Sequence, residues 1–300
     1  MSYIIFHIEG GLGKNIAATA VAKAIKKKHP EKELIIVTAW EEPWHNNPDI
    51  YRIYKFGTLN YFYDDFVKDK DSMIFMHDPY HTTPHIYGTE HLIKTWCELF
   101  DIPYDNEQPE IFLTPREIDY AKNQILVGIQ KPILLIQTNG GQQDLPYSWN
   151  RDLPMQLAQE IVNANAEKYH VIQIKSEKQL ALNNVQHLTR PFREVFAVML
   201  FSQKRLFIDS FAQHAAAALG LPSVVTWITN KPNVFGYDMH DNIVSDVEET
   251  YKTTKYSYLS PYNITGAINE YPYDTRQLFD INKIMDALAQ DKESYVKYDF

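Results

Sequence analysis

Two turns in this chain combine side chains that could bind an anion or move a proton. One is Asp209-Ser210 followed by His214, and the other is the glycine loop Gly10–Gly13 followed by Lys14. A carboxylate and an imidazole can hold a ligand or act as acid and base, and glycines let a backbone approach a phosphate closely. The alternative for both turns is structural, namely local hydrogen bonds, a tight turn and a capping box formed by Ser210 and Gln213.

A third group lies in residues 77–91, which hold four of the chain's 11 histidines, His77, His81, His85 and His91. Their spacing would suit metal ligands on a helix, but Pro79 and Pro84 oppose a continuous helix. We therefore expect no metal site and favour an acceptor-binding loop with Asp78 or His81 as a general base. Solvated loop histidines are the alternative.

Composition excludes several classes of function. The chain has 300 residues, one cysteine (Cys97) and a formal net charge of -9. One cysteine excludes an internal disulfide framework and a multi-cysteine metal site. The acidic balance disfavours nucleic acid and anionic membranes as partners. No apolar run approaches the ~20 residues that span a bilayer, and no basic segment precedes the first apolar stretch, so we expect a cytoplasmic protein.

These chemical groups follow predicted strands of βα units. An apolar strand at 3–8 leads through the glycine loop into a helix that ends in three lysines before Pro30, and a strand follows at 34–37. The pattern returns in the second half, with strands expected at 132–136, 170–174, 206–208 and 224–228. Helices are expected from about Pro154, at 195–200 and at 211–219. The ligand loops thus lie at the carboxyl ends of strands in open parallel sheets.

We predict three segments from this arrangement. Residues 1–128 would form an acceptor-binding Rossmann-like domain, and residues 129–275 a second Rossmann-like domain for a nucleotide sugar. Residues 276–300 would form a helix and tail packing back on the first domain.

The glycine loop departs from two nucleotide-binding motifs. With Gly13-Lys14 as the GK pair of a P-loop, Ile8 stands at the first glycine and Asn15 at the hydroxyl position. The dinucleotide motif G-x-G-x-x-G fails at its third glycine position, which is occupied by Ile16. Neither an NTPase nor an NAD enzyme is therefore favoured.

The order of these pieces resembles the heptosyltransferase group, glycosyltransferase family 9. Residues 209–214 are similar to its D-[ST]-G-x-x-H motif and residues 217–222 to its A-A-x-G-x-P continuation. The opening through Pro30 looks like the family's start, and the resemblance covers most of the chain. The GGxGKN opening and the late segment Phe235-Gly236-Tyr237 are also similar to family-9-related proteins of tailed phages.

The resemblance implies a GT-B fold and an inverting, metal-independent transfer by direct displacement. Asp209, Ser210 and His214 would hold the diphosphate of a nucleotide sugar, and Glu177 would contact the donor ribose. The helix start at Gly11 and Gly13 is expected to help neutralise the leaving group.

Three residues depart from the family pattern. Phe211 replaces a glycine after Asp-Ser, and Arg151 is the substitute for a lysine expected in the 147–153 region. Lys14 occupies the position of the aspartate that the family uses as its base. Lysine is a poor base but a good electrostatic clamp, so we expect it to assist the leaving group while Asp78 or His81 accepts the proton.

We therefore expect a GT-B-type glycosyltransferase that uses a nucleotide-diphosphate sugar, a carbohydrate or other hydroxyl acceptor, and no cofactor. Two alternatives stay open. A non-catalytic nucleotide-sugar-binding protein, such as a phage inhibitor, would account for Lys14. A sugar transferase acting on modified DNA would need a basic groove, to which the lysines at 23–28 could contribute.

Overall fold

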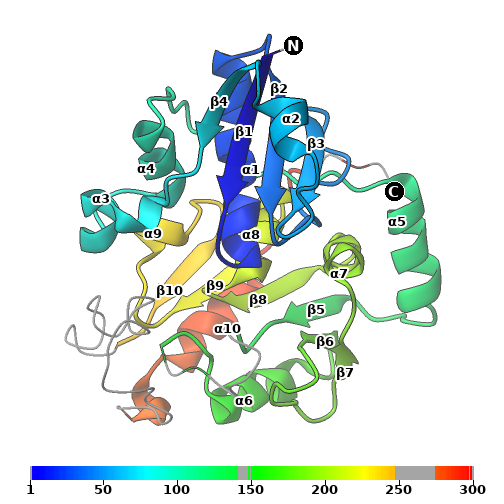
Figure 1. Ribbon diagram of the computed structural model, residues 1–300. Coiled ribbons are helices and arrows are strands. Elements are labelled where there is room, and N and C mark those ends of the chain that lie inside the picture. Colours follow the sequence, from blue (N-terminus) through cyan, green and yellow to red (C-terminus); the bar gives the residue numbers. More distant parts are fainter. Residues whose placement is uncertain (1, 141–147, 149, 247–273, 297, 299–300) are drawn as a thin grey trace. The chain divides into compact units, whose positions relative to one another are not determined.

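The computed structural model of the chain describes residues 2–140, 148, 150–246, 274–296 and 298. The chain divides into two compact units, Met1–Thr114 and Pro115–Phe300, and each contains its own parallel β-sheet (Figure 1). The predicted α/β class with parallel sheets is confirmed.

The first unit is a four-stranded sheet in the order β3-β2-β1-β4, with every neighbouring pair parallel. Its strands are β1 (Ser2–Ile8), β2 (Glu33–Thr38), β3 (Ile50–Lys55) and β4 (Asp71–Phe75). Its helices are α1 (Leu12–Lys28), α2 (Phe62–Phe66), the 3₁₀ turn η1 (Pro79–His81), α3 (Thr83–Tyr87) and α4 (Leu92–Leu99).

Aromatic side chains fill both faces of this sheet. Phe6 of β1 packs edge-to-face against Trp96 of α4, with ring centroids 5.3 Å apart, and also contacts Trp44. Neighbouring side chains on a strand point to opposite faces. Ile5 accordingly packs in a separate cluster with Phe66 of α2. Trp44, in the segment between β2 and β3, is fully buried and belongs to the core of the first unit.

The second unit is a six-stranded parallel sheet in the order β10-β9-β8-β5-β6-β7. Its strands are β5 (Ile133–Ile136), β6 (His170–Ile174), β7 (Gln186–Leu188), β8 (Lys204–Ile208), β9 (Val224–Trp227) and β10 (Asp241–Val244). Its helical segments are α5 (Pro115–Tyr120), the π-helical η2 (Ala121–Ile125), α6 (Met155–Asn165), α7 (Phe192–Met199), α8 (Phe211–Ala218), α9 (Pro232–Phe235), η5 (Thr275–Gln277) and α10 (Ile281–Ala289).

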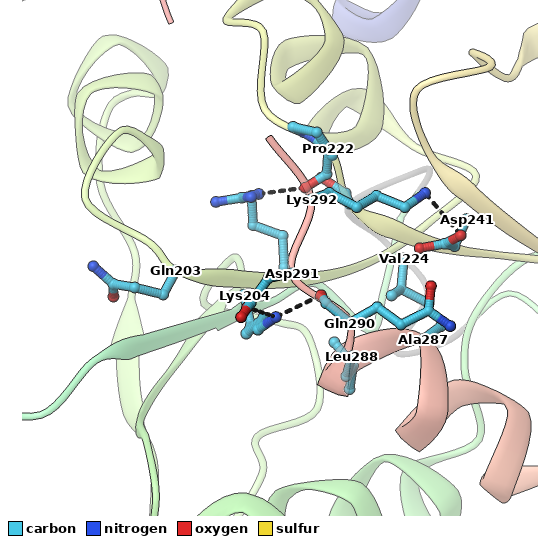
Figure 2. Close-up of a pocket in the computed structure, with 12 residues that line it drawn as sticks. Gln203, Lys204, Pro222, Val224, Asp241, Ala287, Leu288, Gln290, Asp291 and Lys292 are labelled. Atoms are coloured by element: carbon cyan, nitrogen blue, oxygen red, sulfur yellow. Dashed lines mark hydrogen bonds and ion pairs between the residues drawn. The ribbon is translucent and has the colours of Figure 1, made fainter. Parts of the chain in front are cut away.

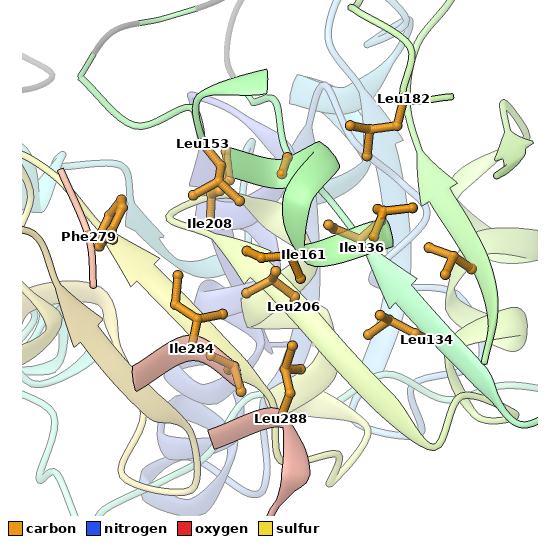
Figure 3. Packing of buried hydrophobic residues seen from close by; sticks show 14 of the residues in the cluster. Leu134, Ile136, Leu153, Ile161, Leu182, Leu206, Ile208, Phe279, Ile284 and Leu288 are labelled. Carbon is orange, nitrogen blue, oxygen red and sulfur yellow. The ribbon is translucent and has the colours of Figure 1, made fainter. Parts of the chain in front are cut away.

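Helices cover both faces of this sheet, with α6 and α10 drawn below it and α7 and α8 above it (Figure 1). Leu206 of β8 lies in a buried cluster with Ile161 of α6 and with Ile284 and Leu288 of α10 (Figure 3). A sheet covered on both faces needs strands that are apolar throughout, which explains the continuous apolar run of β5.

The boundary between the units differs from the expected one. The second unit begins at Pro115 rather than 129, because α5 and η2 contact α7 and Arg193 forms an ion pair with Glu117 at 2.7 Å. Helix α10 packs against the second sheet, where it contacts β8, β9 and β10. The backbone N–H of Tyr295 also donates to the carbonyl of Gly220 at 2.8 Å.

The predicted strands and helices of the βα units are present with small shifts at their ends. Helix α7 begins three residues earlier than expected, at Phe192, and α6 begins at Met155 directly after Pro154. Strands β3, β4, β7 and β10 were not predicted. They are short or partly exposed, so they lack the continuous apolar run that marks the central strands.

Leu206→Ala should lower the free energy of unfolding of the second unit by about 2–5 kcal/mol, because it empties space in a fully buried cluster. Leu180→Ala is the matched control, since Leu180 is 39% exposed and should cost less than about 1 kcal/mol. Urea unfolding of both variants measures the difference, and equal losses would contradict the described core.

Candidate functional site

The loops after β5 and β8 meet at the carboxyl edge of the second sheet. A Cβ atom on Gly140 would lie 2.8 Å from Oγ of Ser210 and 3.3 Å from Cδ of Arg151. Any side chain at position 140 would therefore force one of these groups to move. Glycine at this position lets Ser210, the residue that precedes α8, and Arg151 approach the same backbone segment.

A buried carboxylate fixes this loop. The backbone N–H groups of Gly140 and Ser148 donate to Asp152 at 2.9 and 2.6 Å, and the Asn139 amide donates at 3.1 Å. Burial raises the pKa of Asp152 to about 6, although these N–H groups favour the charged form. Asp152 thus holds both ends of the loop that carries Gly140.

Arg151 has an unusual environment for a partly buried cation. Its Nε is buried without a hydrogen-bond partner, and within the described parts of the chain the guanidinium forms no ion pair. A buried N–H without a protein partner is costly, so Arg151 is a candidate to bind an anion. Arg151 lies against Gly140, on the side where Ser210 precedes the helix.

Asp209 is buried and accepts a hydrogen bond from the amide of Asn230. Burial raises the pKa of Asp209, while the charge of Arg151 and the Asn230 hydrogen bond oppose that shift. The carboxylate is therefore enclosed directly after β8, next to Ser210. Its partner Asn230 was not identified from the sequence.

Ser210 and Gln213 do not form the predicted capping box. Ser210 precedes α8 in extended conformation without a side-chain cap, and its Oγ instead accepts from the Gln137 amide at 3.4 Å. The Gln213 amide donates to the carbonyl of Phe235 at 3.0 Å. The first turn of α8 is held by these tertiary contacts, which local sequence spacing does not reveal.

His214 lies in the first turn of α8 and is buried. Its Nδ1 is 2.8 Å from the hydroxyl of Tyr237, which belongs to the Phe235-Gly236-Tyr237 segment. The expected crevice residues Asp209 and His214 thus share one helix start, and each also has a local hydrogen bond. Both the ligand and the local interpretations of this pair remain compatible with their positions.

The other predicted donor residues lie in different places. Glu177 is exposed in the turn after β6, at the same edge of the sheet. The Phe211 ring packs edge-to-face on Phe192, the first residue of α7, with centroids 5.0 Å apart. Gly11 and Gly13 belong to the first unit, where Gly11 precedes α1.

In the first unit, Gly10 of the glycine loop lies against the side chain of Lys14. Gly10 has a φ of 98°, and a Cβ there would lie 2.9 Å from Cδ of Lys14. Nζ of Lys14 forms an ion pair with Asp78 at 2.6 Å and lies 4.2 Å from the centroid of the Tyr80 ring. Burial lowers the pKa of Lys14, and Asp78 opposes this shift. The structure therefore brings together two of the three predicted catalytic residues.

The structure explains why Asn15 stands where a P-loop has a hydroxyl. Asn15 is fully buried, its amide donates to the carbonyl of Gly11 at 3.1 Å, and its Oδ1 accepts from Trp44 and Thr38. It ties the start of α1 to the end of β2. This residue is a structural anchor of the loop.

The histidines of 77–91 do not form one cluster. His77 and His81 are exposed, while His91 accepts the backbone N–H of Ile93 and so caps α4. His85 is buried and stacks on Tyr80, and burial lowers its pKa to about 4. Within the described ranges, no three His, Cys, Asp or Glu side chains are grouped to hold a metal ion.

A cavity in the second unit lies away from these residues, at the amino ends of β8, β9 and β10 (Figure 2). Its lysines are paired, Lys204 with Asp291 and Lys292 with Asp241, each at 2.8 Å. Because open parallel sheets bind ligands at their carboxyl ends, we assign the site to the Arg151 and Ser210 edge instead.

Each unit is an α/β fold whose parallel sheet carries a polar loop at its carboxyl edge, and the whole chain is similar in fold to solved glycosyltransferases. A glycosyltransferase family 9 structure from Veillonella parvula aligns with a TM-score of 0.69 and 13% identity over 95% of both chains. ADP-heptose LPS heptosyltransferase II of E. coli gives 0.63 and 15% identity, covering 82% of this chain and 92% of that one. E. coli heptosyltransferase WaaC with ADP aligns with a TM-score of 0.56 and 11% identity, covering 81% of this chain and 93% of that one.

The similarity is one of fold. No protein-family model and no curated protein matches this sequence. No helix among the described residues is long and apolar enough to cross a membrane.

The raised pKa of Asp152 predicts a pH dependence. Between about pH 4 and 6 the folded state keeps a proton that the unfolded state has lost, so this residue makes stability fall as pH rises through that window. As pH rises through this window, the free energy of unfolding of the wild type should therefore fall relative to that of Asp152→Asn, by up to about 3 kcal/mol. Urea unfolding at pH 4.5 and 6.5 measures it, and a pH-independent difference would contradict the raised pKa.

Proposed function

We propose that the protein is a glycosyltransferase that moves a sugar from a nucleoside-diphosphate donor to an acceptor hydroxyl, with inversion and without a resident metal. The observation that carries the proposal is the Arg151 guanidinium, which lies beside Gly140 and Ser210 without an ion pair among the described residues. A diphosphate is the kind of anion that arginine and a helix start bind together.

The fold supports the choice of donor class. The similar structures are glycosyltransferases, one of them a heptosyltransferase whose structure contains ADP. In this chain, the loop of Gly140 and the start of α8 lie at the carboxyl edge where α/β sheets receive nucleotides. We assign the donor diphosphate to Arg151, Ser210 and His214, with Asp209 in the wall behind them. Glu177, in the turn after β6, is our candidate for the donor ribose.

The reaction needs stabilisation of the leaving group and a proton acceptor. In a direct displacement, the acceptor oxygen bonds to the anomeric carbon while the bond to the diphosphate oxygen breaks. Arg151 and the backbone N–H groups at the start of α8 would stabilise the negative charge that develops on that oxygen. Without a metal in the proposal, this cationic helix start supplies the electrostatic stabilisation.

We propose Asp78 of the first unit as the base that removes the acceptor proton. Its Oδ1 accepts the backbone N–H of Tyr80 at 2.9 Å, and its Oδ2 pairs with Lys14, so the carboxylate is held from two sides. It remains 25% exposed, which leaves it accessible to an acceptor. Lys14 would then orient the base rather than clamp a phosphate, and exposed His81 is the second choice.

A second candidate function rests on the same ion pair. Because Lys14 occupies Oδ2 of Asp78 at 2.6 Å, the protein could bind a nucleotide sugar without transferring it. Incubation with pooled ADP-, UDP-, GDP- and CMP-sugars and mixed hydroxyl acceptors distinguishes the two. Released nucleotide supports the enzyme, and binding without release for every donor supports the binding protein.

Arg151→Gln should weaken binding of a nucleoside diphosphate by about 10- to 100-fold, the range of a lost hydrogen bond to a charged group. Calorimetric titration with ADP, UDP, GDP and CDP measures it. Arg190→Gln is the control, since Arg190 is exposed and paired with Glu194. Unchanged affinity in Arg151→Gln would remove Arg151 from the site.

Asp78→Asn should lower kcat by about 10²–10⁴-fold with donor affinity unchanged, because general base catalysis contributes on that scale. Asp105→Asn is the control in the same unit, as its carboxylate is exposed and paired with Lys27. Normal turnover in Asp78→Asn would clear Asp78 of this role, and His81→Ala would then be the next variant.

A further inference from the structure

We propose that Tyr237 is a positioning residue for His214: its hydroxyl donates to Nδ1 and fixes the imidazole as the tautomer with its proton on Nε2. The inference extends the proposed function, since His214 is assigned there to the donor diphosphate. It concerns the Phe235-Gly236-Tyr237 segment, for which the sequence suggested a resemblance but no role.

The segment from Asn230 to His240 is fastened to the start of α8 at several points. Asn230 donates to Asp209, and Gln213 donates to the carbonyl of Phe235. The backbone N–H of Ser223 donates to Nδ1 of His240, so Nε2 of His240 carries the proton and donates to the carbonyl of Gln213 at 3.0 Å. The segment thus contacts Asp209 and Gln213, which precede His214 in the chain, and Ser223, which follows α8.

The same segment brings Tyr237 into position. Gly236 follows α9 directly, and a Cβ there would lie 2.7 Å from the carbonyl oxygen of Pro232. The Asn242 amide donates to the carbonyl of Tyr237 at 3.1 Å. Tyr237 is 5% exposed, so its ring is enclosed and its hydroxyl has little freedom to turn away from His214.

Chemistry decides the direction of the bond between the two side chains. The phenol hydroxyl is the more acidic partner and a neutral imidazole nitrogen is the stronger acceptor, so O–H···N is the favoured arrangement. The separation of 2.8 Å fits such a bond. A proton on Nε2 then makes His214 a donor without a charge, so its contribution to anion binding does not depend on protonation of the ring.

The test measures the tautomer directly. Long-range ¹H–¹⁵N NMR of ¹⁵N-histidine-labelled protein distinguishes a protonated from an unprotonated ring nitrogen, and loss of one signal in His214→Gln assigns it. We expect wild-type His214 to carry its proton on Nε2, and Tyr237→Phe to populate both tautomers. Tyr169→Phe is the matched control, a tyrosine of the same unit that is 6% exposed, and it should leave the signal unchanged.

Affinity for ADP provides the second measurement. Tyr237→Phe should weaken it by about 3- to 10-fold, the scale of one neutral hydrogen bond, and Tyr169→Phe should not. A wild-type His214 protonated on Nδ1, or an unchanged tautomer in Tyr237→Phe, would overturn the inference. If the wild type binds no nucleotide, the proposed function fails, while the NMR result still decides the role of Tyr237.

Discussion

The close approach of Gly140 to Ser210 is the constraint on which the candidate donor site depends. With only 2.8 Å between Oγ of Ser210 and the place of a Cβ, no side chain fits between the loops after β5 and β8. Asp152 fixes the Gly140 loop by accepting three N–H groups, and it lies next to Arg151 in the chain. The buried carboxylate of Asp152 and the lack of a side chain at Gly140 therefore set the positions of Arg151 and of the start of α8.

The first unit uses the same architecture differently. Its glycine loop also follows a strand and opens a helix, but the cation there, Lys14, is buried and paired with Asp78. Asn15 fixes the loop at the start of α1, because its Oδ1 accepts hydrogen bonds from Thr38 and Trp44. Because Lys14 already has a carboxylate partner, it is less suited to bind an incoming phosphate than Arg151, which forms no ion pair among the described residues. This contrast is why we assign the diphosphate to the second unit and the acceptor chemistry to the first.

The sequence was informative where local rules decide the structure, and it failed where contacts are distant. The apolar runs of β1, β5 and β8 and the position of α8 followed from periodicity and from glycine and proline signals. The predicted capping box of Ser210 was wrong because Gln137, 73 residues away, binds its hydroxyl. Asn230 and Asp152 carry no local signature of their roles. Apolar spacing in α10 identifies a buried face but not the sheet that buries it, so the contacts of α10 with β8, β9 and β10 could not be predicted.

We expect a nucleoside diphosphate to bind at the Arg151 and Ser210 edge of the second sheet. Hydrogen exchange of the full chain, with mass-spectrometric detection and with and without saturating ADP, UDP, GDP or CDP, tests it most directly. The nucleotide that binds should protect peptides covering 137–140 and 209–214 from exchange. Protection confined to the glycine loop at residues 10–14, or no protection by any of the four nucleotides, would contradict it.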